Sequence, residues 1–357
     1  MRKILVAIVV TVLTCASLLA AGRELRIYFI DVEGGQSTLI VTPAGETLLV
    51  DAGYPGRDGR DPDRIQAAMR DAKVSRIDYL LVTHMHEDHN GGVGELAKRV
   101  PIGAFIDYGS PVETGDDVIA AFKAYSAARD KDGKNGAPHI IPKPGDPLPL
   151  LGLDVRVVSA DGEALSTPLP GAGQPNAACA GYEPRPFATR ENPRSIGIHL
   201  RYGRFRFLDL GDLVGPALLK LVCPNNLIGR VDAYLLTHHA DVDTNVPPVL
   251  AAIRPRVAIS NNGGYKGGSP QTFVTLREHA EVEGVWQLHK AMRYGVDENV
   301  SDAFIANLEF GVRDRGEWLK LTASDAGSFS VTNGRTGWTR TYDDRPYGAR
   351  PAAVGTK

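Results

Sequence analysis

The chain has 357 residues, with 40 basic and 42 acidic side chains and a formal net charge of −2 at pH 7. This balance excludes a polybasic protein that binds nucleic acid through counterion release, so we expect no strong nucleic-acid footprint. With 43% hydrophobic residues the chain is too apolar to be disordered, and its three cysteines are too few for a disulfide scaffold.

The N-terminus has the features of an export signal. Arg2 and Lys3 precede an apolar run, Ile4–Leu13, and then small residues that end at Gly22. This order is typical of a secretory signal peptide, to which we assign residues 1–22. A retained anchor is the alternative, because the uncharged run is barely long enough to span a membrane. Without its two cations the mature chain has 38 basic and 42 acidic side chains, a net charge of −4.

Export predicts a periplasmic or secreted protein and changes how the cysteines are interpreted. No later segment has the run of about 18 apolar residues that a membrane span needs, so we expect no span beyond an uncleaved signal. In an oxidising compartment Cys179 and Cys223 can form one disulfide, a hypothesis that rests on their number alone.

Strand-like and helix-like segments alternate along the mature chain. Runs of β-branched and aromatic residues predict strands at Leu25–Asp31, Ser37–Thr42, Glu46–Asp51, Ile77–Val82, Leu153–Ser159, Ser195–Tyr202, Phe205–Leu210, Asp232–Leu236 and Val257–Ser260. Apolar residues at helical spacing predict helices at Asp61–Lys73, Gly94–Val100, Asp116–Ala128, Val214–Val222, Pro247–Ile253 and Pro270–Ala280. This alternation indicates one α/β domain over residues 23–331. Residues 161–194 lack periodicity and predict a loop insertion, and residues 332–357 predict an irregular tail.

One eight-residue pattern occurs twice. Ile77–His84 (IDYLLVTH) resembles Val231–His238 (VDAYLLTH), and in both a strand that begins with Asp is followed by Thr-His. We infer two strand–loop units of similar design, each of which delivers a His to one cleft.

The segment after the first of these strands concentrates metal-binding side chains. Three of the nine His of the chain lie within six positions, at His84, His86 and His89, together with Asp88. Zinc and similar ions need imidazole nitrogens and carboxylate oxygens that converge. In a loop that leaves a strand, His84 and His86 point to one side, and after a bend Asp88 and His89 can face a second ion. Gly91-Gly92 follow and allow the backbone to turn tightly.

These residues carry a resemblance to a known family. Thr83–Gly92 (THMHEDHNGG) is similar to the HxHxDH signature of the metallo-β-lactamase-fold superfamily, and the segments Leu48–Gly53, Phe207–Asp212 and Val231–His239 resemble its other motifs. The resemblance covers most of the mature chain and implies an α/β fold, a four-layer αββα sandwich. More narrowly, the chain resembles the extracytoplasmic hydrolase domains of the competence-type DNA-uptake family, through Phe29–Val32 and the run 192–212.

The resemblance implies two metal ions. His84 and His86 would hold the first ion, Asp88, His89 and His238 the second, and Asp212 would bridge the two. We choose His238 over its neighbour His239 because the repeated pattern aligns it with His84. The residues implied to orient these ligands, or to act as further ligands, are Asp51, Thr83, Asn192, Thr237 and His239.

Two departures from the family pattern affect these expectations. The third His of the first ion should precede Ser195, but the chain has Asn192 there, which offers a weaker oxygen ligand. His199 lies inside the following strand on its outward face, and we expect it at the surface. Ser269 stands where the competence-type subgroup has a His, which argues against a nuclease. The nearby Tyr265 and Lys266 are candidates to line the substrate cleft.

The predicted function is that of an exported metallo-hydrolase with two Zn²⁺ ions, and manganese or iron in place of zinc is not excluded by the sequence. Two ions activate water against an ester, lactone or phosphodiester, and we expect Asp88 to orient the attacking group. One alternative is a non-catalytic metal-binding or surface module on the same fold. Another is a di-iron redox protein, although those relatives usually have Glu in place of His86.

Overall fold

The computed structural model describes residues 24–130, 137–184, 187, 189–279, 281–295 and 298–344. The predicted signal peptide, residues 1–22, and the last 13 residues of the predicted tail, 345–357, lie outside this part. Within it, none of the helices combines the length and the apolar character that crossing a membrane requires.

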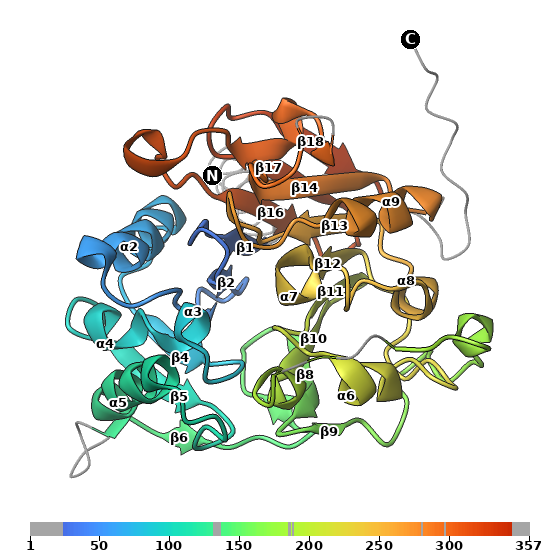
Figure 1. Cartoon of the computed structure of the whole chain (residues 1–357), viewed down its shortest axis with the longest axis horizontal. Coiled ribbons are helices and arrows are strands. Elements are labelled where there is room, and N and C mark those ends of the chain that lie inside the picture. Colours follow the sequence, from blue (N-terminus) through green and yellow to red (C-terminus); the bar gives the residue numbers. More distant parts are fainter. Residues whose placement is uncertain are drawn as a thin grey trace, which may run out of the picture.

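The first sheet has the strand order β18-β17-β16-β1-β2-β3-β4-β5-β6. Neighbouring strands from β18 to β3 are antiparallel, and those from β3 to β6 are parallel. Its strands are β1 (Leu25–Phe29), β2 (Thr38–Val41), β3 (Thr47–Val50), β4 (Ile77–Leu81), β5 (Ile102–Ile106), β6 (His139–Ile140), β16 (Leu319–Ala323), β17 (Phe329–Asn333) and β18 (Thr339–Tyr342). Helices α2 (Arg60–Ala72), α4 (Val93–Leu96) and α5 (Asp116–Asp130) lie beside this sheet, on the left of Figure 1.

The second sheet has the order β15-β14-β13-β12-β11-β10-β8-β7, with β9 paired to β8. Strands β11 to β15 are parallel. Its strands are β7 (Pro147–Leu148), β8 (Asp154–Ala160), β9 (Glu163–Ala164), β10 (Gly197–Tyr202), β11 (Phe205–Asp209), β12 (Ala233–Leu235), β13 (Val257–Ser260), β14 (Gly284–His289) and β15 (Ile305–Asn307). Helices α6 (Gly215–Lys220), α8 (Pro247–Ile253) and α9 (Pro270–Glu278) lie on the opposite side of the molecule, on the right of Figure 1.

Two hydrophobic cores hold these layers together. The larger core contains residues of both sheets, such as Leu49, Leu200 and Phe207, which face each other between them. The second core contains Leu208 and residues of α6, α8 and α9, so it lies on the outer face of the second sheet. Because successive residues of a strand point to opposite faces, Phe207 and Leu208 belong to different cores. The predicted αββα sandwich is therefore confirmed.

Most predicted elements are found within two or three residues of their expected bounds, and two differ more. The helix expected at Gly94–Val100 is shorter, and α4 covers only Val93–Leu96. The tail predicted to be irregular from residue 332 contains strand β18, which pairs with β17 as Phe329↔Tyr342. The prediction was wrong there because Thr339–Tyr342 (TRTY) is short and half exposed, so its apolar pattern is weak.

The loop insertion is fixed to the second half of the molecule. Cys179 and Cys223 form a disulfide, as their number suggested. The bond ties the short helix η2 (Ala177–Cys179) to the segment that follows α6. A further 3-10 helix, η3 (Asn192–Arg194), ends the insertion next to β10. Within the described part, residues 161–194 are otherwise irregular apart from β9.

Candidate metal centre

The ends of three strands bring the candidate ligands together. Helix α3 (Glu87–Asn90) follows β4, Asp212 follows β11, and the short turn α7 (Thr237–Ala240) follows β12. Figure 1 shows α3 and α7 on the facing sides of the two halves of the molecule. The sequence thus places its polar residues directly after buried apolar strands, where a rigid sheet positions them.

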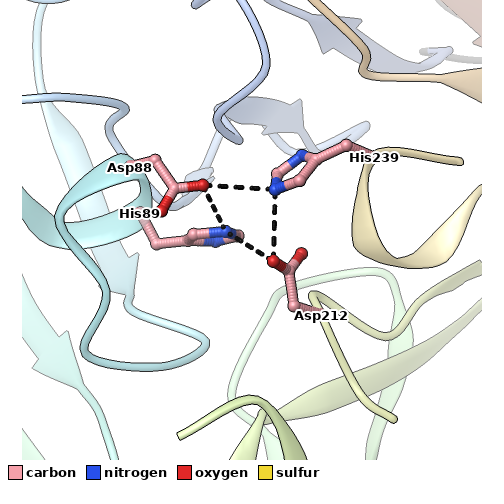
Figure 2. A group of neighbouring side chains, drawn as sticks. All are labelled: Asp88, His89, Asp212 and His239. Carbon is pink, nitrogen blue, oxygen red and sulfur yellow. Dashed lines mark ion pairs between the residues drawn. The ribbon is translucent and has the colours of Figure 1, made fainter. Parts of the chain in front are cut away.

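Four buried side chains, Asp88, His89, Asp212 and His239, form one cluster that could hold a metal ion. Figure 2 shows them converging from three segments. The Nε2 atom of His239 lies 3.2 Å from Oδ2 of Asp88 and 3.1 Å from Oδ2 of Asp212. The Nε2 atom of His89 lies 3.2 Å and 3.3 Å from the same two oxygens.

These distances suit a shared ion. Two atoms bound at about 2.1 Å to a tetrahedral ion lie roughly 3.4 Å apart, close to the spacings in the cluster. The Nε2 atoms of His89 and His239 and Oδ1 of Asp212 are also buried without a hydrogen-bond partner in the described structure. Because buried polar atoms are normally paired, the donor set fits a cation at this position.

The imidazole that joins Asp88, His89 and Asp212 in the cluster is that of His239, not that of His238 as expected. His238 Nε2 lies 3.9 Å from Oδ2 of Asp212, whereas His239 contacts both Asp212 and Asp88. The repeated pattern was misleading because the backbone after the two strands differs. His238, His239 and Ala240 have positive φ angles of 56°, 54° and 64°, a left-handed turn that the first His-rich segment lacks.

A second group of imidazoles lies beside this cluster. Nε2 of His84 is 3.0 Å from Nδ1 of His86 and 3.9 Å from Oδ2 of Asp212. The other nitrogen of His86 lies 3.2 Å from a carboxylate oxygen of Glu113. The side chain of His86 is 20% exposed whereas those of His84 and His89 are fully buried, so His86 lies on the solvent side of the centre.

His238 borders the same solvent side. Its Nε2 lies 3.2 Å from Nδ2 of Asn192, and its Nδ1 lies 3.1 Å from Oδ1 of Asp243. Oδ1 of Asn192 is buried and has no hydrogen-bond partner among the described residues. The predicted proximity of Asn192 to the centre is therefore found, with His238 as its neighbour.

Asp51 and Thr83 contact His89, one of the four residues of the cluster. Oδ2 of Asp51 lies 2.7 Å from Nδ1 of His89, and the hydroxyl of Thr83 donates to the same oxygen at 2.7 Å. Such a carboxylate partner fixes the ring orientation and leaves Nε2 available as a ligand. Thr237 acts differently, because its carbonyl oxygen accepts hydrogen bonds from Thr244 and Asn245 and so supports the turn.

Of the two candidates to line the substrate cleft, only Lys266 contacts the centre. Its Nζ lies 2.5 Å from Oδ2 of Asp88 and 3.5 Å from the hydroxyl of Tyr54. Tyr265 is 58% exposed, and its ring lies edge-on to Phe310 with 4.8 Å between the centroids.

The electrostatics of the centre ionise its two carboxylates, keep His84 neutral and favour positive charge between them. Burial, and then His89, hold the pKa of His84 well below its usual value, so its ring is neutral. Burial opposes ionisation of Asp88, but Lys266 and His89 outweigh it and hold the pKa of Asp88 well below the usual range. His239 and His89 do the same for Asp212 against the effect of burial. Burial also disfavours a charged His89, but Asp212 and Asp88 raise its pKa well above the usual value, so the carboxylates attract positive charge.

Sequence reasoning missed three residues that complete the centre, namely Glu113, Asp243 and Tyr54. Glu113 is 27 residues from His86, and nothing in their spacing indicates the contact. Asp243 offered a weak signal, because it follows His238 by five residues in an acidic turn.

Gly92 was expected to permit a tight turn, but it permits two backbone segments to approach closely, since an added Cβ would lie 2.1 Å from the carbonyl oxygen of Ala52.

Comparison with known families supports the superfamily prediction. Residues 30–174, which include the complete His84–His89 segment, match the model of the metallo-beta-lactamase superfamily. No curated protein matches the chain. The competence-type subgroup remains a prediction.

Several solved structures are similar to this chain at low identity. They include CmlA, a diiron beta-hydroxylase from Streptomyces venezuelae, at 15% identity with a TM-score of 0.41, over 74% of this chain and 53% of CmlA. Zn²⁺-bound PqqB from Methylobacterium extorquens has 16% identity and a TM-score of 0.34, over 56% and 58% of the two chains. The short form of human tRNase Z has 12% identity and a TM-score of 0.36, over 67% and 93%. The chain thus spans about half the length of CmlA.

Proposed function

We propose that this protein is an exported hydrolase that uses two divalent ions, zinc in the first instance, to direct water at an ester, lactone or phosphodiester. The observation that carries the proposal is the convergence of buried, unpaired imidazole and carboxylate atoms around Oδ2 of Asp212. Two bound ions would make water nucleophilic near neutral pH and would stabilise the developing oxyanion.

The residues divide between the two ions. Asp88, His89 and His239 would hold the second ion, and Asp212 would contribute to holding both. His84 and His86 would hold the first. We assign the remaining position on the first ion to His238, because it has the carboxylate partner on Nδ1 that His89 also has. This assignment supplies the imidazole that Asn192 does not provide.

The chain's own groups orient the substrate and water. The low pKa of Asp88 keeps its carboxylate ionised, so it accepts hydrogen bonds and orients a water rather than carrying a proton. The ammonium of Lys266 lies against Asp88, and the side chain is 41% exposed, so it can contact a negative oxygen of a substrate that approaches from solvent. The hydroxyl of Tyr54 lies 3.5 Å from the same ammonium.

Metal analysis and a substrate panel test the proposal. The panel combines nitrophenyl esters, a lactone and bis(4-nitrophenyl) phosphate, and inductively coupled plasma mass spectrometry counts the ions. We expect His86→Ala to lose hydrolysis and an ion, because His86 is a ligand, whereas His279→Ala, a histidine outside the centre, keeps both. Full activity and metal content in His86→Ala would refute the assignment.

The same measurements separate the alternatives. Bound zinc without turnover across the panel would favour the non-catalytic metal-binding module. Iron as the main bound metal, with redox activity instead of hydrolysis, would favour the di-iron protein.

Export needs its own experiment, because it depends on residues 1–22 alone. We expect expression of the full chain in a bacterial host to give a protein outside the cytoplasm, with a mature N-terminus near residue 23 by mass spectrometry. A cytoplasmic protein with an intact N-terminus would contradict the predicted signal peptide.

A further inference from the structure

A cavity of about 450 Å³ lies on the outer face of the second sheet. Its floor includes residues of β8, β10 and β11, and its walls are residues 165, 167–171 of the loop insertion and residues 228–230. It borders Arg206 near the start of β11, whereas Asp212 follows the end of that strand, so the cavity is separate from the metal centre. Its volume is within the usual range of small-molecule sites, about 300–1,000 Å³.

The alternation of β10 explains why polar residues form this floor. Ile198 and Leu200 face the core between the sheets, so His199 and Arg201 face outward. The sequence placed His199 at the surface, but the loop insertion covers it, and only 6% of the residue is exposed. The expectation was wrong because nothing in the strand pattern shows which segment packs over that face.

The wall made by the loop insertion is held in place. The N–H of Leu169 donates to the carbonyl oxygen of Leu227 at 2.8 Å, and the N–H of Gly173 donates to that of Asn226 at 2.7 Å. The disulfide between Cys179 and Cys223 fixes the following residues to the same half of the molecule. The cavity is therefore built into the fold.

The lining carries an excess of positive charge. Four guanidinium groups line the cavity, at Arg156, Arg201, Arg206 and Arg230, against one carboxylate, Asp154. Asp154 pairs with both Arg156, at 3.0 Å, and Arg201, at 3.3 Å, so it neutralises only one of the two charges. Glu281, beyond the lining, pairs with Arg230 at 3.5 Å but also with Arg254.

The walls of the cavity are apolar, and its floor contains a buried polar atom without a hydrogen-bond partner in the described structure. Leu165, Leu169 and Ile228 contribute hydrocarbon surface, together with two prolines of the loop. Nε2 of His199 is buried and has no hydrogen-bond partner in the described structure. Arginine forks match the geometry of carboxylate and phosphate oxygens, and the hydrocarbon walls suit an apolar body.

We propose that this cavity binds a small organic anion, with a carboxylate or phosphate group held by the arginines and an apolar body against the loop insertion. The inference goes beyond the proposed hydrolase and does not depend on it, because the two sites share no residue. It also assigns a role to the insertion, which forms the wall that the ligand contacts.

The test uses 8-anilinonaphthalene-1-sulfonate, a fluorescent probe with an anionic group and an aromatic body, titrated into the mature, metal-loaded protein. The variant Arg156→Glu/Arg201→Glu reverses two lining charges whose side chains are 42% and 46% exposed, so the fold should tolerate the change. The control Arg76→Glu/Arg313→Glu makes the same change in net charge at side chains that are 58% and 76% exposed. Thermal unfolding of each variant confirms that it is folded.

We expect saturable binding to the wild type, weakened by about tenfold or more in the cavity variant and nearly unchanged in the control, because like charges repel the probe. Leu169→Asp should weaken binding as well, since it puts a charge on the apolar wall. Excess inorganic phosphate should displace the probe if the arginines recognise the anionic group. Absence of saturable binding, or an equal loss in the cavity and control variants, would overturn the proposal.

Discussion

Replacing His238 with alanine tests how the first ion is held. Oδ2 of Asp212 lies 3.9 Å from Nε2 of His238 and also 3.9 Å from Nε2 of His84, so the two rings flank one oxygen. If the proposed assignment holds, His238→Ala would leave the first ion with His84, His86 and Asp212, whereas the second ion would keep all of its ligands. We therefore expect the ion count to fall from two per chain to one, measured by mass spectrometry after equilibration with limiting zinc.

A milder change gives the magnitude. Asp243→Asn keeps the imidazole of His238 but weakens the 3.1 Å contact between its Nδ1 and Oδ1 of residue 243. Loss of such a partner lowers metal affinity by about 10–100-fold, or roughly 1.4–2.7 kcal/mol. Competition with a chromophoric chelator should show this loss on one ion only, and a larger loss in His238→Ala. His239→Ala is the matched control, because it removes a ligand of the other ion.

A rescue variant separates a ligand from a residue that only supports the fold. Nδ2 of Asn192 lies 3.2 Å from Nε2 of His238, so a histidine at position 192 would place its ring near the same point. Adding Asn192→His to His238→Ala should restore the lost ion. Two tightly bound ions in His238→Ala alone, or no gain from Asn192→His, would refute the assignment of His238 to the first ion.

Three further predictions concern other parts of the molecule. Burial, and then Arg206, lower the pKa of His199 to about 4. Between pH 6.5 and 4 the unfolded chain therefore binds a proton at this residue that the folded chain does not. The free energy of unfolding should fall by up to about 3 kcal/mol as the pH drops through this range. His199→Gln should flatten this part of a pH series of urea denaturation, and an unchanged series would show that the side chain is not protected. Cys179→Ser/Cys223→Ser removes a cross-link between residues 44 positions apart, and the free energy of unfolding should fall by about 2–4 kcal/mol, whereas equal stability in urea would contradict a formed disulfide. Lys266→Met removes the ammonium beside Asp88 and should lower kcat/KM by about 100-fold with both ions retained; unchanged kinetics would exclude Lys266 from substrate binding.

The sequence predicted the parts of the centre that depend on strand ends and spacing. His84, His86, Asp88 and His89 follow a buried strand within six positions, and their convergence follows from that short spacing. Asp212 was expected from the resemblance to the metallo-β-lactamase fold, and it lies shortly after the end of β11. The fold class followed from the alternation of strands and helices, which composition and periodicity show clearly.

The rest depended on features that spacing does not encode. Aligning His238 with His84 assumed that the backbone after both strands is the same, but the left-handed turn at 238–240 presents His239 to Asp88 instead. Glu113 reaches His86 only because the chain between them returns to the centre, a tertiary contact with no local signal. The burial of His199 also depends on a distant segment, the loop insertion.

The left-handed turn is costly and must be held by its surroundings, which gives a last prediction. Non-glycine residues in this region cost about 1–3 kcal/mol each, and three occur in succession. The N–H of Gly268 donates to the carbonyl oxygen of His239 at 2.8 Å, and that of Ser269 to Ala240 at 3.0 Å. Gly267 lies against the same turn, since an added Cβ would be 2.1 Å from the carbonyl oxygen of His239.

Gly267→Ala should therefore displace His239 and weaken the second ion, while the first ion stays bound. Gly311→Ala is the matched control, because Gly311 has a φ of +68°, close to the +70° of Gly267, but no atom within 4 Å of the added Cβ. Alanine at a positive φ angle is strained in both variants, so both should lose a similar amount of thermal stability from the backbone. Only the contact with His239 distinguishes them, and the affinity of the second ion measures that contact. Equal affinities in the two variants would show that the turn does not depend on Gly267. The backbone hydrogen bonds from Gly268 and Ser269 would then be enough to fix the position of His239.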